Sequence, residues 1–168
     1  GSVDNLNSIA NIYISMGEFS EADDALSRAI RLARDISDSL ALGSTLQFSS
    51  FLYSRTADFR KGLSNNDSAI AIFNKSGHMI RLANTYASRG TLLSSMGENK
   101  LSIQAQLYAD SLYKEEIQEE QRGILFNNIG TVYTSQGDYN TALKYLQKSL
   151  AVLPKGVISE SYLLTQGN

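Results

Sequence analysis

Residues that could carry out catalysis or bind a metal are scarce in this sequence. It contains one histidine, His78, and no cysteine, which excludes a disulfide, a thiolate metal site and a cysteine nucleophile. The motifs of zinc peptidases, serine hydrolases and nucleotide-binding loops are also absent from the sequence. His78 lies between two helical patterns, where a histidine is more often structural than catalytic. We therefore expect no catalytic residue, no metal site, no cofactor and no enzymatic activity of this segment.

One dense cluster of carboxylates is formed by Glu115, Glu116, Glu119 and Glu120. Such groups could serve as acids, bases or cation ligands if apolar surroundings shifted their pKa values. The segment 114–122 is instead polar and rich in strong helix formers. We interpret it as the end of one helix, a short turn and the start of the next, with the glutamates on a solvated face.

The overall composition limits the remaining function classes. The 168 residues fit one domain with a substantial core, and the net charge of −2 gives no electrostatic argument for a nucleic acid or an anionic membrane as partner. No run of about 18 or more apolar residues is present, so we expect no membrane insertion by this segment. A single proline favours long, uninterrupted helices. The lack of cysteine fits any redox compartment and leaves the localisation open.

The helical patterns that would position polar side chains are clearest in the segment 122–156. The first helix has an apolar or small face, at i, i+3, i+4 and i+7, formed by Phe126, Ile129, Gly130 and Tyr133. A turn at Gly137 interrupts this pattern. The second helix has a face formed by Ala142, Leu146 and Ser149. Pro154 ends the unit, which is therefore predicted to be a helical hairpin.

The same unit recurs at an interval of 40 residues. Steps of 40 back from Gly137 reach three further small residues, each between two helical patterns: Gly97, Ala57 and Gly17. Small residues suit a tight turn between antiparallel helices. The first copy matches the last well, and its predicted core positions are Leu6, Ile9, Ala10 and Tyr13. The second copy is degenerate, and we expect its second helix to be soft and to begin irregularly around Gly62–Asn66, because a helical glycine costs about 1 kcal/mol relative to alanine.

The spacing aromatic-x-x-Ile-Gly-x-x-Tyr, then Ala-x-x-x-Leu, then Pro resembles the tetratricopeptide repeat (TPR) pattern. The resemblance implies an all-α, right-handed α-solenoid with a single domain at 3–156. Its four repeats lie at about 3–37, 39–77, 78–118 and 122–156, and 157–168 is a tail or partial capping helix. A period of 40 rather than about 34 residues resembles the long repeats of bacterial peptide-sensing regulators, sensor kinases and cyclases, and of kinesin light chain and Pins-type adaptors.

TPR arrays curve, and their leading helices line the concave side. The outward positions of these helices are rich in amides and hydroxyls, which can bond both the donors and the acceptors of a peptide backbone. The predicted peptide-binding groove consists of Asn7, Asn11, Gln47, Phe48, Phe51, Arg55, Asn84, Thr91, Asn127, Asn128 and Thr131. Phe48 and Phe51 would form an apolar pocket and Arg55 an anionic contact. Alternatively, the amides are merely solvated and the two phenylalanines fill space left by small neighbours.

The resemblance implies a non-catalytic module that binds a protein or peptide partner. We expect a sensing or scaffolding segment of a larger, bacterial signalling protein, and the opening Gly-Ser reads as a cloning remnant. Two alternatives stay open: self-assembly as a homodimer through the end repeats, or the regulatory region of a sensor kinase or cyclase whose catalytic domain is absent. Relatives that clamp acidic chaperone tails carry several cations in the groove, and here Arg55 stands alone.

Overall fold

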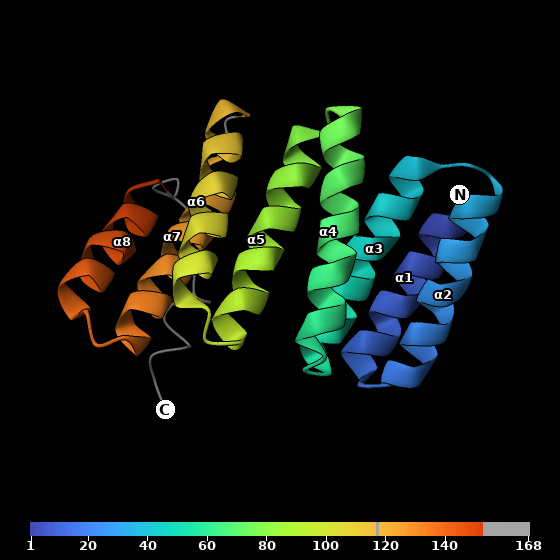
Figure 1. The fold of residues 1–168 in the computed structure, drawn as a ribbon, viewed down its shortest axis with the longest axis horizontal. Helices are drawn as coiled ribbons and strands as arrows, with labels where there is room; N and C mark the ends of the chain where they lie inside the picture. The colour runs from blue at the N-terminus through green and yellow to red at the C-terminus, as the bar shows by residue number, and fades with distance from the viewer. Residues whose placement is uncertain (117, 153–168) are drawn as a thin grey trace.

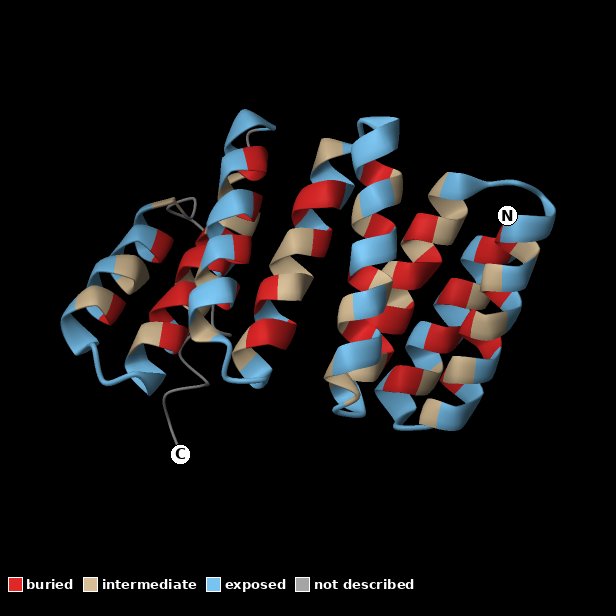
Figure 2. Cartoon of the chain, in the orientation of Figure 1, coloured by how far each residue is buried: buried red, intermediate tan, exposed pale blue. Residues whose placement is uncertain are grey.

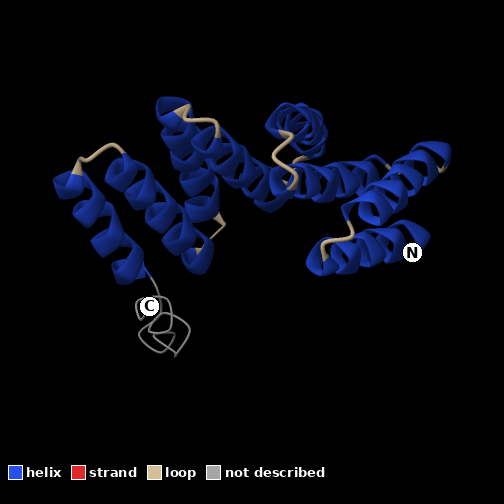
Figure 3. Cartoon of the chain, turned by 90° about the horizontal axis from the view of Figure 1, so that it is seen from below, coloured by secondary structure: helices blue, strands red, loops and turns tan. Residues whose placement is uncertain are grey.

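The computed structural model describes residues 1–116 and 118–152, and these form helices connected by short turns, with no strand (Figures 1 and 3). The helices are α1 (Ser2–Met16), α2 (Phe19–Asp35), α3 (Ser39–Arg55), α4 (Phe59–Ser76), α5 (Met79–Ser95), α6 (Asn99–Glu115), α7 (Glu119–Ser135) and α8 (Tyr139–Val152). They follow one another in chain order along a curved row. The all-α solenoid predicted from the sequence is therefore confirmed. Pro154 and the segment 157–168 lie outside the described residues.

Each helix packs against the next, and the leading helices α1, α3, α5 and α7 also contact one another in turn. Within the described residues, no contact joins successive second helices α2, α4, α6 and α8. The leading helices thus form the tighter, inner row of the solenoid. Buried residues lie where neighbouring helices face each other (Figure 2). None of the helices in the described part of the chain has the length and apolar character needed to cross a bilayer.

The turns recur twice as often as the sequence repeat. From α2 to α8 the successive helices begin 20 residues apart. A residue with positive φ lies two positions ahead of these starts, at Gly17, Ser37, Ala57, Gly77, Gly97 and Gly137. Asp38 and Asp58 then cap the following helices by accepting hydrogen bonds from backbone N–H groups. Sequence analysis identified the turns within hairpins and the turn at His78, beside Gly77, but not the left-handed residue at Ser37.

The second helix of the second hairpin is regular, contrary to expectation. α4 runs without interruption from Phe59 to Ser76. Gly62 is buried, and a Cβ on it would lie 3.1 Å from the nearest Leu92 side-chain atom. Asn66 is also buried and donates to Ser88 Oγ at 3.5 Å. The residues that break the sequence pattern therefore let α4 pack closely on α5, so a tertiary contact outweighs the low helix propensity of glycine.

One predicted core residue is exposed. Ile9 of α1 is 43% exposed, whereas Ile129, at the matching position of α7, is fully buried. The difference arises because α6 packs against α7, whereas α1 contacts only α2 and α3 among the described helices. Residues at the position of Ile9 and Ile129 are buried by the preceding hairpin rather than by their own. Ile9 was therefore wrongly predicted to be a core residue.

The left-handed turns give a first prediction. Ala57 has φ of 59°, a conformation that costs an L-residue free energy and glycine little, so Ala57→Gly should stabilise the protein by ~0.5–1 kcal/mol. Thermal unfolding followed by circular dichroism measures the change. The control is Gly17→Ala, because Gly17 has φ of 81° and open space around it, so only backbone strain is added. If Gly17→Ala stabilises the protein or Ala57→Gly destabilises it, the turn argument is wrong.

Candidate functional site

An apolar hollow of about 310 Å³ lies on the inner row between α3 and α5, lined by Gln47, Phe48, Phe51, Asn84 and Ser88. Four of these residues belong to the predicted groove. Phe48 is half-buried against the core between the first two hairpins, but Phe51 remains 46% exposed. Phe48 therefore partly fills space beside its small neighbours, as in the alternative interpretation given above. Phe51 does not fill such space, because almost half of it is exposed.

Two amides at this hollow are held by bonds within the protein. Gln47 Nε2 donates to the Arg81 carbonyl at 3.1 Å and to Thr85 Oγ1 at 2.6 Å. Asn84 Oδ1 accepts a hydrogen bond from the Tyr113 hydroxyl. Since an amide has both donor and acceptor atoms, these bonds leave the oxygen of Gln47 and the NH₂ group of Asn84 available. The hollow thus combines an apolar floor with one fixed acceptor and one fixed donor.

A second, polar hollow of about 210 Å³ lies between α5 and α7, lined by Thr91, Ser94, Ser95, Gln106, Asn128 and Thr131. Three of these residues were predicted from the sequence. Gln106 comes from the second helix α6 and reaches the inner row because α5 carries Gly90 opposite it. Sequence reasoning missed Gln106, because it read that position as a substituted core residue. The available signal was a polar residue where the first and last hairpins carry Leu26 and Leu146.

The other predicted groove residues line neither hollow. Asn11 and Arg55 are exposed on the inner helices, and Asn127 is half-buried. Asn7 was expected to lie open in the groove, but it is only 3% exposed. The prediction was wrong because α1 packs directly against α3 as well as α2, and Asn7 is buried in this packing. Its Oδ1 has no hydrogen-bond partner among the described residues.

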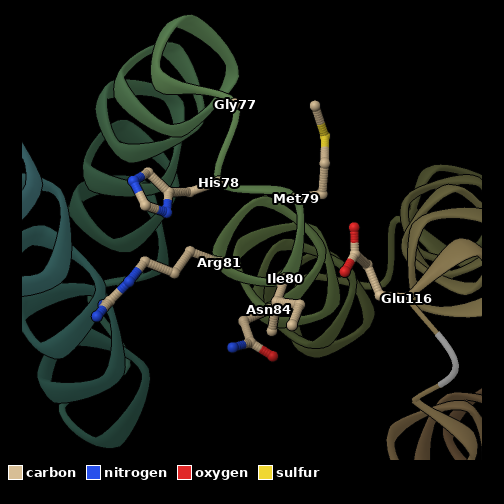
Figure 4. A pocket seen from close by; sticks show the side chains of 7 residues that line it. All are labelled: Gly77, His78, Met79, Ile80, Arg81, Asn84 and Glu116. Atoms are coloured by element: carbon tan, nitrogen blue, oxygen red, sulfur yellow. The ribbon is translucent and has the colours of Figure 1, made fainter.

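A further hollow of about 610 Å³ surrounds the start of α5 and is lined by His78, Arg81 and Glu116, among others (Figure 4). His78 occupies the turn before α5, as predicted. Figure 4 shows the Glu116 carboxylate near Met79, while His78 and Arg81 extend to the other side of the helix start. Arg81 donates to Ser44 Oγ at 2.6 Å. These groups do not converge on one point, so the hollow contains no acid–base pair.

The glutamate cluster lies at the turn between α6 and α7, as predicted. Glu115, Glu116 and Glu120 are exposed. Arg122 pairs with Asp110 at 2.7 Å and with Glu119 at 2.9 Å, and these carboxylates, Asp110 foremost, raise its pKa. The described residues contain no group of three or more carboxylate or histidine side chains that could hold a metal ion. The Arg122–Asp110 pair thus joins α7 to α6, while Glu119 pairs with Arg122 within α7.

Two of the four hairpins match a known family of repeats. Residues 3–36 and 124–155 each match the tetratricopeptide repeat family. No curated protein is a significant relative by sequence.

Solved structures with the same fold share little sequence with the chain. The structure of BtubC from P. vanneervenii is 15% identical with a TM-score of 0.79, over 95% of this chain and 68% of that one. A signal transduction ATPase with numerous domains (STAND) from Pyrococcus horikoshii, which has a tetratricopeptide repeat sensor, is 17% identical with a TM-score of 0.80. That match covers 89% of this chain but only 23% of the ATPase. A kinesin light chain protein with nearly identical TPR-like repeats from Podosopora anserina is 12% identical with a TM-score of 0.76, over 95% and 77% of the two chains.

The buried phenols give a second prediction. Burial raises the pKa of Tyr113 to about 12, and burial together with the hydrogen bond to Asp23 raises that of Tyr53 to about 12. The folded state therefore favours the protonated phenols. Their contribution to stability should be complete below pH 10 and should be lost as the pH rises from 10 through 12, because the unfolded chain ionises first.

Phenolate absorbance and urea unfolding at increasing pH measure both effects. Tyr113→Phe provides the control, because it should remove one late-ionising phenol and part of the alkaline loss of stability. Ionisation of all tyrosines together near their ordinary pKa would contradict the burial argument.

Proposed function

Because the chain carries tetratricopeptide repeats, which are protein-interaction modules, we propose that it binds an extended peptide segment of a partner protein along α3, α5 and α7. The observation that carries this proposal is the hollow at Phe48 and Phe51, with a fixed amide donor and a fixed amide acceptor beside it. A peptide group has one N–H and one C=O, so this pair matches it. The amides are already held in place, which lowers the entropy lost on binding.

The phenylalanines would receive an apolar side chain of the peptide. Interfaces draw most of their affinity from a few aromatic or apolar anchors that become buried in a pocket. Phe51 is the exposed aromatic side chain at the hollow, so it would gain most from being covered. Phe48 is packed from below and would provide a rigid floor.

The partner segment would be uncharged rather than acidic. No charged side chain lines either of the two inner hollows within the described residues. Arg89 is paired with Asp67, and Arg122 with Asp110 and Glu119. Several unpaired cations side by side would be needed to hold an acidic tail, and the inner surface does not offer them.

We further propose that the domain is of the long-repeat type and belongs to the sensing or scaffolding part of a larger signalling protein. The first suggestion is supported by the spacing of the turns, since Gly17, Ala57, Gly97 and Gly137 share one left-handed conformation 40 residues apart. The second is supported by the similar repeat sensor of the STAND ATPase, of which this chain spans about a quarter.

A third prediction tests the peptide function. Peptides are selected from a random display library on the immobilised chain and measured by calorimetry. Phe51→Ala should weaken a selected peptide about tenfold or more, since it removes a central anchor. Replacing Asn127 and Asn128 together by alanine should also weaken binding and leave the melting temperature almost unchanged, because their side chains bond no other described residue.

The matched control is Asn74→Ala, an exposed amide of α4 away from the inner row, which should change neither quantity. Equal losses of stability and affinity in the double variant would mean that Asn127 and Asn128 are structural. Failure to select any peptide on the folded chain would remove the proposed function.

As a second function we propose self-assembly through the open face of α1, supported by apolar residues on that face. Ile12 is 58% exposed, whereas Leu52 and Val132, the matching residues of α3 and α7, are 1% and 2% exposed because the preceding helix covers them. The complementary surface on a second copy would be α8, which exposes Leu143 and Leu150. This head-to-tail contact would continue the packing of one hairpin on the next.

A fourth prediction follows for the oligomeric state. Sedimentation velocity at increasing protein concentration should detect association, and Ile12→Glu should abolish it, because a carboxylate cannot be buried in an apolar contact. Leu101→Glu on α6, which alters another exposed leucine, should not affect association. A strict monomer at high concentration, or equal effects of the two variants, would exclude this interface.

A further inference from the structure

We propose that the polar hollow between α5 and α7 is a specificity subsite for the side-chain carboxamide of an asparagine or glutamine in the bound peptide. The proposal rests on the peptide-binding function and adds to it the chemistry of one partner side chain. It is based on the hydrogen-bonding state of the groups that line the hollow, which composition alone does not reveal.

Three of the four hydroxyl groups of this hollow, those of Thr91, Ser95 and Thr131, are already committed as donors. Thr91 Oγ1 donates to the Ala87 carbonyl at 3.2 Å. Ser95 and Thr131 likewise donate to the carbonyls of Thr91 and Asn127, at 3.2 and 3.1 Å. A hydroxyl has one proton and two lone pairs, so each of these groups can now only accept. Three of the six lining residues therefore present acceptors.

Gln106 adds a further acceptor at the hollow. Its Nε2 donates to Ser102 Oγ at 3.3 Å, while its Oε1 is buried with no hydrogen-bond partner among the described residues. The whole residue is 1% exposed. A buried acceptor that lacks a donor lowers stability, so such a group calls for an explanation.

Packing does not require an amide at this position. Leu26 and Leu146 occupy the matching positions of α2 and α8. Gly130 faces Leu146 as Gly90 faces Gln106, and a Cβ on either glycine would come within 3.0 Å of the facing side chain. Leucine would therefore fit opposite Gly90. The chain has glutamine at position 106, where leucine would make the protein more stable. This choice points to a role of Gln106 in binding.

The group that fits an acceptor-rich, uncharged hollow is a neutral N–H donor. A carboxylate would bring only acceptors, and an ammonium or guanidinium would lose water without gaining a counter-charge. A carboxamide brings two N–H donors for Gln106 and the hydroxyls. It also brings a carbonyl that the amide of Asn128 can bond. The volume of about 210 Å³ exceeds the ~30 Å³ share of a water molecule several times and admits one such side chain.

The two hollows are close enough to be occupied by one peptide. Ser88 lines the apolar hollow and Thr91 the polar one, and they lie three residues apart on α5. Neighbouring helices pack roughly 8–10 Å apart, and an extended chain advances about 3.3 Å per residue. The carboxamide should therefore lie about three residues from the apolar anchor.

The test compares dodecapeptides selected from a random display library on the full chain and on its Gln106→Leu variant. We expect the wild-type chain to select Asn or Gln about three residues from an apolar residue. A synthetic peptide with this motif should bind Gln106→Leu about tenfold or more weakly, although the variant melts roughly 2–4 °C higher. Gln104→Leu, which replaces an exposed glutamine of the same helix, should not change affinity.

Replacement of the peptide glutamine by Glu, Lys or Leu supplies a second readout on the unaltered protein, and each should weaken binding. This series decides the matter if Gln106→Leu fails to fold. Equal binding of the Gln and Leu peptides, or an unchanged affinity of a folded Gln106→Leu, would show that Gln106 serves packing only, while the peptide function would stand. Selection of no peptide at all would overturn both.

Discussion

The close approach of the two helices in each hairpin is the constraint on which the rest of the structure depends. A Cβ on Gly90 would lie 2.4 Å from Gln106 Cγ, and one on Gly130 would lie 3.0 Å from Leu146 Cγ. Nothing larger fits at these positions unless the second helix moves away. Because the leading helices are drawn so close to their partners, they also reach one another across successive hairpins and form the inner row.

Apolar and polar interior positions are divided between different hairpins. The first and last hairpins place Leu26 and Leu146 opposite the small residue of the leading helix, while the middle two place Asn66 and Gln106 there. Both of these amides are buried with an oxygen that has no partner among the described residues, which costs about 1–3 kcal/mol each. In a solenoid the stability of each unit adds to that of its neighbours. The apolar outer hairpins can therefore offset the polar interior of the middle ones, which lie beside the hollows.

Much of the fold could be predicted from the sequence because its signals are local. The turn residues and the period of about 3.6 locate the helices, and the recurrence of Gly17, Ala57, Gly97 and Gly137 locates the hairpins. Burial could not be predicted as well, because it depends on which other helix covers each face. Asn7 is buried and Ile9 exposed for this reason. Seven predicted groove residues on leading helices line one of the two hollows, whereas Ser94 of α5 and Gln106, which enters from a second helix, were not among the predicted residues.

Which donors and acceptors the inner surface offers depends more on the direction of its hydrogen bonds than on its amino-acid composition. Serine and threonine in a helix can donate to the carbonyl four residues earlier, and Thr91, Ser95 and Thr131 do so. These three hydroxyl groups thereby become groups that only accept. At the apolar hollow, bonds to Tyr113 and Thr85 instead fix which end of Asn84 and Gln47 is available. For the peptide binding proposed above, the inner row would distinguish partner groups without charges, and such recognition would be little screened by salt.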